Sequence, residues 1–323
     1  MLFVLKHCIF FGIFLLCVYI PVIGFGAEFS AQRADFSIHV QNIEIPYKIM
    51  SIFVMPEEIV KLRIMADHTK SSEFSIQSSH GQIKHLKENQ WHWRAPSLPG
   101  HYSLNIYRGQ KTDSILLNIF VMVPRKHQQG EYLNGYRIGN YPHILFKGLP
   151  NYSPPRGFVE VTAANAETLI SPHFRLNQFL CKQDGEYPKY LVLKENLLLK
   201  LEVIIQEINA KGYRCDSLHV MSGYRTQYYN KEIGNVKYSR HIYGGAADIY
   251  IDENPKDDMM DDLNQDGKID YKDAAIIYEI IDGLYGKPFY KSLVGGLARY
   301  KKNANHGPFV HIDVRGRRAR WGD

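Results

Sequence analysis

Cysteine is scarce in this sequence, with four residues among 323. Two of them lie in an apolar segment at the N-terminus, so only Cys181 and Cys215 remain in the rest of the chain. An even number of cysteines in an exported protein favours a disulfide, which would stabilise the fold by up to about 4 kcal/mol. We therefore expect a Cys181–Cys215 bridge, with a pair of buried free thiols as the alternative.

A strong excess of one charge is also lacking. The formal net charge is +6, and the basic residues are spread along the chain except for a group near its C-terminus: Arg315, Arg317, Arg318 and Arg320. No nucleic-acid-binding module is recognisable, so we expect no nucleic-acid partner. Mild basicity suits an anionic polymer such as the cell wall, but does not identify one.

The first 26 residues have the pattern of a secretory signal peptide. A positively charged start precedes an apolar run from Cys8 to Phe25, and small residues stand before a possible cleavage site at Ala27. The alternative is an uncleaved anchor, because the run is nearly long enough to span a bilayer. We therefore expect a secreted protein of the periplasm or cell envelope, which contacts the membrane only through this segment if it is uncleaved.

Residues 28–125 are predicted to form an all-β domain. Turn residues separate short runs that alternate or are rich in β-branched residues, at 36–40, 60–64 and 114–121. The segments Trp91–Pro96 and Pro99–Leu104 resemble the late strands of small immunoglobulin-like sandwich domains. No catalytic group stands out in this region, so we expect a structural support or a module that faces the cell wall.

The pattern changes twice after this domain. Residues 126–170 form a connector rich in glycine, proline, tyrosine and asparagine, with one strand-like piece at 157–161. From Ser171 to 323 the pattern is mixed: a short helix is expected from Ser171 to Cys181, and a long amphipathic helix from Leu191 to Ala210. Strands are expected at 218–221, 246–251 and 309–314.

Two short stretches in this last region bring metal-binding side chains together. Residues 239–248 contain His241 and Asp248 with small residues between them, and residues 309–313 contain His311. These three side chains are nitrogen and oxygen ligands of the type that a catalytic zinc takes, leaving a fourth position open. Asp313 would face the same side as His311, because alternate residues of a strand share a face.

The first stretch resembles a family motif position for position. Its matching residues follow the pattern S-x-H-x-x-G-x-A-x-D of the M15 zinc D,D-peptidases: Ser239, His241, Gly244, Ala246 and Asp248. The resemblance covers roughly residues 171–323 and implies an α+β protein with an M15/hedgehog-like zinc peptidase domain after the immunoglobulin-like one. It also implies that His241, Asp248 and His311 bind zinc, and that Ser239 and Tyr243 contact substrate.

A third stretch, Ser222–Asn230, resembles the S-G-Y-R-[ST]-x-x-x-N segment of the same family. The resemblance implies that Arg225 binds the carbonyl or carboxylate group of the substrate. A planar guanidinium suits that task, because it also stabilises developing oxyanion charge. The alternative is that Arg225 forms a structural salt bridge.

The chain lacks the acid that many family members carry before the last histidine as general base. Pro308 stands at that position, and Phe309 stands where other members have a histidine. The remaining candidates for the base are His306 and Asp313. His306 is favoured, because it lies on a loop, and loops bring groups to the open side of a zinc site.

Residues 262–273 follow the pattern of an EF-hand calcium loop. Oxygen ligands fall at the expected loop positions and glycine stands at the sixth. The predicted ligands are Asp262, Asn264, Asp266, Lys268 through its carbonyl group, Asp270 and Asp273. Asp273 replaces the usual glutamate, as in dockerin-like modules. We expect a structural calcium ion in an insertion, with a solvated acidic loop as the alternative.

The resemblance implies a secreted zinc peptidase that hydrolyses D-amino-acid-containing bonds of peptidoglycan peptides, as a D,D-carboxypeptidase or an endopeptidase. The missing acid leaves a second hypothesis, a catalytically inactive wall-binding or scaffold protein that keeps zinc as a structural ion. A third hypothesis is a calcium-dependent adhesion module, which would use the sandwich domain and the calcium loop.

Overall fold

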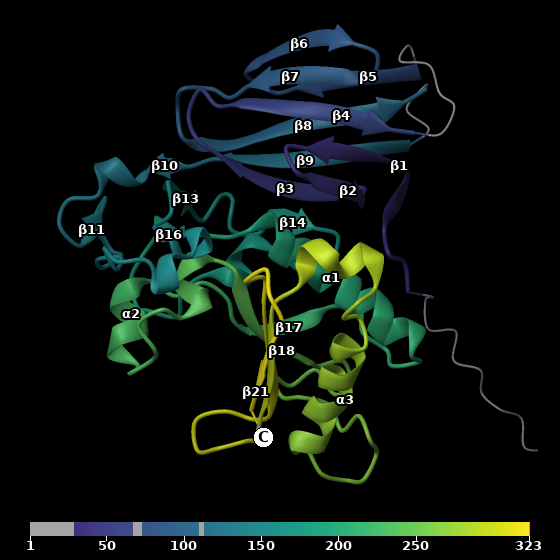
Figure 1. Ribbon diagram of the computed structural model, residues 1–323, viewed down its shortest axis with the longest axis vertical. Coiled ribbons are helices and arrows are strands. Elements are labelled where there is room, and N and C mark those ends of the chain that lie inside the picture. The colour runs from purple at the N-terminus through teal and green to yellow at the C-terminus, as the bar shows by residue number, and fades with distance from the viewer. Residues whose placement is uncertain (1–28, 67–72, 110–112, 323) are drawn as a thin grey trace, which may run out of the picture.

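The computed structural model describes residues 29–66, 73–109 and 113–322. The predicted signal peptide therefore lies outside the described residues. A β-sandwich forms the first part of the chain, and a smaller sheet flanked by helices forms the last part (Figure 1). Within the described ranges, no helix is both long and apolar enough to cross a membrane.

The predicted all-β region is confirmed as two packed sheets. One is antiparallel, in the order β2-β1-β4-β7-β6, with strands Arg33–Val40 (β1), Ile43–Tyr47 (β2), Ile59–Met65 (β4), Gln82–Lys87 (β6) and Gln90–Arg94 (β7). The other has the order β3-β9-β8-β5, with strands Ile49–Val54 (β3), Phe74–Ser78 (β5), Gly100–Arg108 (β8) and Asp113–Val121 (β9). Alternation places Val60, Leu62 and Ile64 of β4 in the core, as a half-buried strand requires.

The predicted connector is largely packed against the rest of the molecule. Its strand-like piece is confirmed as β13, Gly157–Val161, which pairs with both neighbours, β10 (Val123–Pro124) and β16 (Lys189–Leu191). The other elements are short: η2 (Arg125–His127), β11 (Tyr132–Leu133), β12 (Tyr136–Arg137), η3 (Phe146–Gly148) and η4 (Pro150–Tyr152). Tyr141 is buried, and its hydroxyl donates to the carbonyl oxygen of Ile242 at 2.8 Å.

The short helix predicted from Ser171 to Cys181 is wrong. The chain instead forms a small hairpin, β14 (Leu169–Ser171) with β15 (Phe174–Arg175), followed by one 3-10 turn, η5 (Leu176–Phe179). Ser171 does not cap a helix, because its hydroxyl donates to the buried Glu202 carboxylate at 2.6 Å.

The last part is built around a five-stranded sheet in the order β17-β18-β20-β19-β21. Its strands are Leu218–Ser222 (β17), Ala246–Ile251 (β18), Gly296–Tyr300 (β19), Phe309–Asp313 (β20) and Ala319–Trp321 (β21). The helices and turns around it are Glu195–Ala210 (α1), Gln227–Glu232 (α2), Arg240–Tyr243 (η6), Tyr271–Asp282 (α3) and Pro288–Leu293 (η7). The predicted strands and the long helix are thus confirmed, although α1 begins later than expected because Leu191 belongs to β16.

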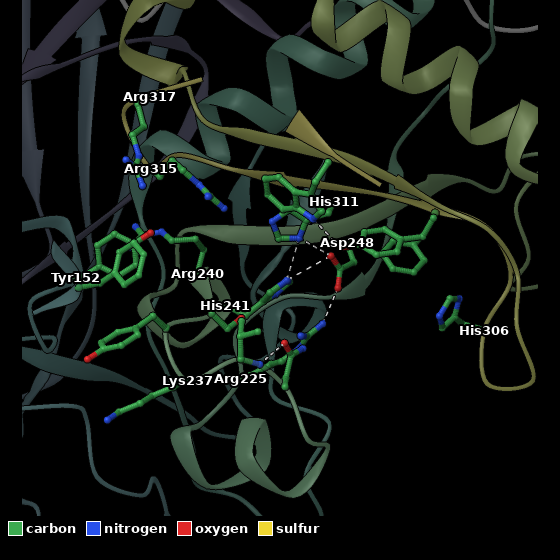
Figure 2. A pocket seen from close by; sticks show the side chains of 18 residues that line it. Tyr152, Arg225, Lys237, Arg240, His241, Asp248, His306, His311, Arg315 and Arg317 are labelled. Atoms are coloured by element: carbon green, nitrogen blue, oxygen red, sulfur yellow. Dashed lines mark hydrogen bonds and ion pairs between the residues drawn. The ribbon is translucent and has the colours of Figure 1, made fainter. Parts of the chain in front are cut away.

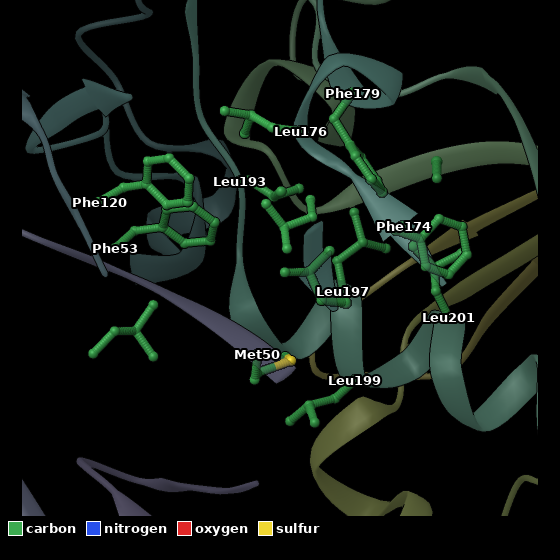
Figure 3. Close-up of a cluster of buried hydrophobic side chains, with 14 of the residues drawn as sticks. Met50, Phe53, Phe120, Phe174, Leu176, Phe179, Leu193, Leu197, Leu199 and Leu201 are labelled. Atoms are coloured by element: carbon green, nitrogen blue, oxygen red, sulfur yellow. The ribbon is translucent and has the colours of Figure 1, made fainter. Parts of the chain in front are cut away.

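The sandwich and the last part share one hydrophobic core. Met50, Phe53 and Phe120 from the sandwich gather beside Leu197 and Leu199 of α1 (Figure 3). The backbone N–H of Phe53 also donates to the Glu195 carboxylate at 3.0 Å. The two parts are therefore packed against each other and are not joined only by a linker.

The predicted Cys181–Cys215 disulfide is wrong, because both cysteines are free and buried. Cys181 follows η5, and its sulfur accepts a hydrogen bond from the backbone N–H of Thr226 at 3.5 Å. Cys215 lies between α1 and β17, with its sulfur 3.5 Å from the carbonyl oxygen of Ser217. The two thiols therefore lie in different environments, and their spacing in the sequence does not predict this separation.

Lys200 on α1 is buried beneath the end of β20. It is 1% exposed, and its ammonium group donates to the carbonyl oxygen of Asp313 at 2.8 Å. Burial lowers the pKa of Lys200 to about 7. The unfolded chain holds this proton up to about pH 10. The unfolded state therefore binds more protons than the folded state above pH 7, so this group makes stability rise as the pH is raised.

Replacing this lysine should change the pH dependence of stability. From pH 7 to pH 9, the free energy of unfolding of the wild type should rise by about 1–3 kcal/mol relative to that of Lys200→Met. Urea unfolding at several pH values measures the difference, and the exposed Lys211→Met is the control that should keep the wild-type slope. Parallel curves for the wild type and Lys200→Met would contradict the lowered pKa.

Candidate active site

Strand pairing and one tight turn bring the three predicted metal ligands together. Asp248 on β18 lies directly opposite His311 on β20 in the antiparallel register. His241 reaches them from η6, which ends at Gly244 with a left-handed φ of 63°. A Cβ atom at Gly244 would collide with the carbonyl group of Val192, so this position requires glycine.

The ligand atoms of these three buried side chains form a small triangle (Figure 2). His241 Nε2 lies 3.3 Å from Asp248 Oδ1 and 3.2 Å from His311 Nδ1. His311 Nδ1 lies 2.8 Å from Asp248 Oδ1. Ligand atoms of a tetrahedral zinc with bonds of about 2.0–2.1 Å lie about 3.3 Å apart, so the triangle is close to one face of such a site.

Contacts on the far side of each imidazole orient the two rings. His241 Nδ1 donates to the carbonyl oxygen of Gly223 at 2.7 Å, and His311 Nε2 faces Asp313 Oδ2 at 3.4 Å. The atoms that face Asp248 are therefore His241 Nε2 and His311 Nδ1, and without a metal the latter donates to the Asp248 carboxylate. This is the arrangement in which carboxylate and carbonyl groups orient the histidine ligands of a metal. The donor set thus fits zinc.

The charges of the triangle also favour a cation. Burial by itself would raise the pKa of Asp248, but His241 and His311 hold it well below its usual range. Burial lowers the pKa of His241, so this imidazole is held neutral. For His311, burial acts in the same direction, but hydrogen bonds with Asp248 and Asp313 raise the pKa. A metal ion would therefore displace a proton from His311.

Arg225 follows β17 and lies beside the triangle. Its Nη2 donates to Asp248 Oδ2 at 2.6 Å, and its Nε donates to the Ser222 hydroxyl at 2.9 Å. The structural salt bridge that was the alternative is therefore present. Arg225 also lines the pocket in front of the triangle.

Asp313 lies behind His311, away from the ligand triangle. One carboxylate oxygen accepts the backbone N–H groups of Gly296 at 2.8 Å and Arg315 at 2.9 Å. The guanidinium group of Arg315 pairs with the same carboxylate. Burial alone would raise the pKa of Asp313, but His311 and Arg315 hold it well below its usual range. These contacts suit Asp313 for orienting His311 and make it a poor proton acceptor.

His306, the other candidate base, lies on the loop before β20. Its Nδ1 donates to the carbonyl oxygen of Gly307 at 2.7 Å, so its Nε2 accepts from the Asn303 amide at 2.8 Å. It lines the same pocket as the triangle but is set apart from the three ligands in Figure 2. Both nitrogens of His306 are therefore bonded within its own loop, and Nε2 must leave the Asn303 amide before it can accept a proton.

The pocket in front of the triangle has a volume of about 660 Å³. Ser239 lines it, whereas Tyr243 lies behind Arg240 and is not among the lining residues. Most of the wall is aromatic and cationic, and no sequence motif marks these residues: Phe146, Tyr152, Tyr238, Tyr300, Trp321, Lys237, Arg240, Arg315 and Arg317. Phe146 and Tyr152 come from the connector, whose composition gave no sign of this role.

The predicted calcium loop lies on the surface before α3, and its carboxylates bond within the loop. Asp262 accepts the backbone N–H of Gly267 at 2.7 Å, and Asp273 accepts that of Asp270 at 2.8 Å. Lys272 pairs with Asp266 at 2.9 Å. Among the described residues, the groups of three side chains that could hold a metal ion include no residue of this loop. The structure does not support the calcium site, which stays a prediction.

Gly296 allows the carboxylate of Asp313 to come close to β19. A Cβ atom there would collide with Asp313 Oδ2 and with the Trp321 ring. Gly296→Ala should therefore displace Asp313, tilt His311 and weaken zinc binding by about 10–100-fold. Competition with a chromogenic chelator measures this affinity. Gly307→Ala is the matched control, because its Cβ would meet nothing within 4 Å, and equal zinc affinity for both variants would contradict the assigned role of Asp313.

Comparison with known proteins agrees with the geometry in one part of the chain. Residues 172–273 match the family model described as Peptidase M15. No curated protein matches the chain. The match contains Arg225, His241 and Asp248, whereas His311 lies beyond it.

Two solved structures resemble parts of the chain only weakly. The Lin-41 filamin domain has 13% identity and a TM-score of 0.17, over 25% of this chain and 90% of that one. The titin M3 domain has 7% identity and a TM-score of 0.18, over 27% of this chain and 97% of that one. These scores are too low to support a fold assignment. The family match supports an M15 peptidase domain that contains the first two of the three proposed ligands.

Proposed function

We propose that this protein is a secreted, zinc-dependent peptidase that hydrolyses D-amino-acid-containing bonds of peptidoglycan peptides. One observation carries the proposal. His241, Asp248 and His311 converge in a pocket with one ligand atom of each close to those of the other two, within and next to the segment that resembles the M15 peptidases. A domain of that family supports a peptidase, and the cell-wall substrate and the export are our extension of it.

The residues of the site have separable roles in this proposal. His241, Asp248 and His311 would hold the ion, and zinc, when bound, supplies a Lewis acid for the scissile carbonyl and for the attacking water. Arg225 stabilises the negative charge that develops on the carbonyl oxygen, while its bond to Asp248 fixes its position. His306 accepts the proton of the attacking water through Nε2, once that nitrogen has left the Asn303 amide, and Asp313 keeps the imidazole of His311 oriented.

The sandwich supports the catalytic part in this proposal. We infer that it is immunoglobulin-like, from its two packed sheets and from the sequence of its late strands. Its contact with α1 suits a fixed support better than a mobile spacer, and a role in wall binding stays a prediction.

A specific observation favours the inactive scaffold as the second candidate. Among the described residues that line the pocket, Asp248 is the single carboxylate, and it belongs to the ligand set. The site therefore lacks an acidic base, and activity depends on whether His306 replaces it.

Hydrolysis of purified muropeptides tests the proposal directly. The mature protein, loaded with zinc, should release D-amino acids or open cross-links, detected by mass spectrometry, and a chelator should stop the reaction. His241→Ala should lose zinc and activity together, while Gly307→Ala should keep both. Zinc binding without any product from monomeric or cross-linked muropeptides would favour the scaffold.

The two candidate bases should respond differently to substitution. His306→Gln should lower kcat by about 10²–10⁴-fold and leave zinc content unchanged, since a general base contributes about that much. Asp313→Asn should mainly weaken zinc affinity, by about 10–100-fold, because it acts through His311. Metal analysis and steady-state kinetics separate the two outcomes, and the reverse result would make Asp313 the base.

A further inference from the structure

One charged group in the pocket wall has no compensating partner. Arg240 is 3% exposed, and its Nη1 donates to the carbonyl oxygen of Asn151 at 2.8 Å. Its Nε and Nη2 are buried without any hydrogen-bond partner in the described part of the chain. Burying a charge and its N–H groups without partners is costly, so such a group calls for an explanation.

No carboxylate of the described residues neutralises this guanidinium at ion-pair distance. Asp313 attracts it most strongly but is already paired with Arg315. The neighbouring ammonium group is also cationic: burial and the charge of Arg240 lower the pKa of Lys194 to about 8. Arg315 and Arg317 line the same end of the pocket, and Figure 2 shows them on the same side of it as Arg240. Positive charge is therefore concentrated here.

The immediate contacts of Arg240 are aromatic. Its guanidinium carbon lies 4.5 Å from the centre of the Tyr152 ring and 5.3 Å from that of Tyr243. These faces hold the planar group by cation–π attraction and accept no strong hydrogen bond from its edge. Arg240 and Tyr152 both line the pocket, so the guanidinium belongs to the wall that a ligand would contact.

We propose that Arg240 binds a carboxylate of the peptide substrate, and that the pocket selects peptides in which this carboxylate is free and not amidated. A carboxylate matches the fork of donors on a guanidinium and would satisfy the two unpartnered N–H groups together. The inference rests on the proposed peptidase function, and it names the acidic peptide as the substrate class. Arg240 is a different anchor from Arg225, which is held by Asp248 next to the metal ligands.

The test is a pair of short, non-cleavable D-amino-acid peptides that differ only in one carboxylate, free in one and amidated in the other. Their affinities for the zinc-loaded protein are measured by titration calorimetry, with the fluorescence of Trp321 in the pocket wall as a second signal. The wild type should prefer the free carboxylate by about 10–100-fold, the usual range for a buried charge-assisted bond. Equal affinities would overturn the proposal.

Variants assign the preference to this residue. Arg240→Met should remove it, and Arg240→Lys should keep a part of it, because a lysine retains the charge without the fork. Arg318→Met is the matched control, because that arginine pairs with Asp282 and does not line the pocket. A folded, zinc-binding Arg240→Met that keeps the full preference would show that Arg240 is only structural.

The proposal can also be tested if Arg240→Met does not fold or if the protein is not a peptidase. If Arg240→Met does not fold, the wild-type peptide pair and Arg240→Lys still decide, and an undiminished preference in Arg240→Lys would overturn the proposal. Because binding is measured without turnover, a carboxylate preference in a protein that cleaves no muropeptide supports Arg240 as an anchor while the peptidase function fails. Cleavage with no preference between the two peptides gives the opposite result.

Discussion

The buried carboxylate of Asp313 is the interaction on which the site depends. It joins the backbone of β19 through Gly296, the guanidinium of Arg315 and the imidazole of His311 at the end of one strand. The carbonyl group of the same residue accepts from Lys200, so α1 is attached to this point as well. A charge at this depth is tolerated only because each of its oxygens has partners. The position of His311, the last of the proposed metal ligands, is therefore fixed by contacts from three separate elements.

Arg225 and Arg240 lie in parts of the pocket that differ in their balance of charge. Arg225 belongs to the negative side, because Asp248 compensates its charge. Arg240 belongs to a side where cations outnumber the carboxylates that could balance them. An elongated peptide with a polarised carbonyl near one end and an anionic group toward the other matches this division. For the proposed peptide substrate, this charge distribution would restrict the orientation of the bound peptide as well as its chemistry.

The sequence was sufficient for the elements with strong local patterns. The strand at 246–251 and the helix ending at Ala210 follow from hydrophobic periodicity. The resemblance to the M15 motif pointed to His241, Asp248 and His311, and the structure brings these three side chains together. Contacts between residues that are far apart in the chain could not be predicted from the sequence. Asp313 is bonded to Gly296 and Arg315, and no local pattern predicts those partners. Cys181 and Cys215 lie in separate environments, which rules out a bridge between them. No periodicity marks Tyr152 as part of a pocket. The helix predicted after Ser171 is absent for the same reason. The Ser171 hydroxyl, which would have capped it, donates instead to the buried carboxylate of Glu202.

The shared core between the sandwich and α1 also determines what would happen if the sandwich were lost or exchanged. Met50, Phe53 and Phe120 cover apolar side chains that the helix would otherwise expose to water. Losing the sandwich, or exchanging it for an unrelated module, would leave that surface bare and the Glu195 carboxylate without its backbone donor. The two parts therefore act as a single packing unit, in which neither keeps its apolar surface covered without the other.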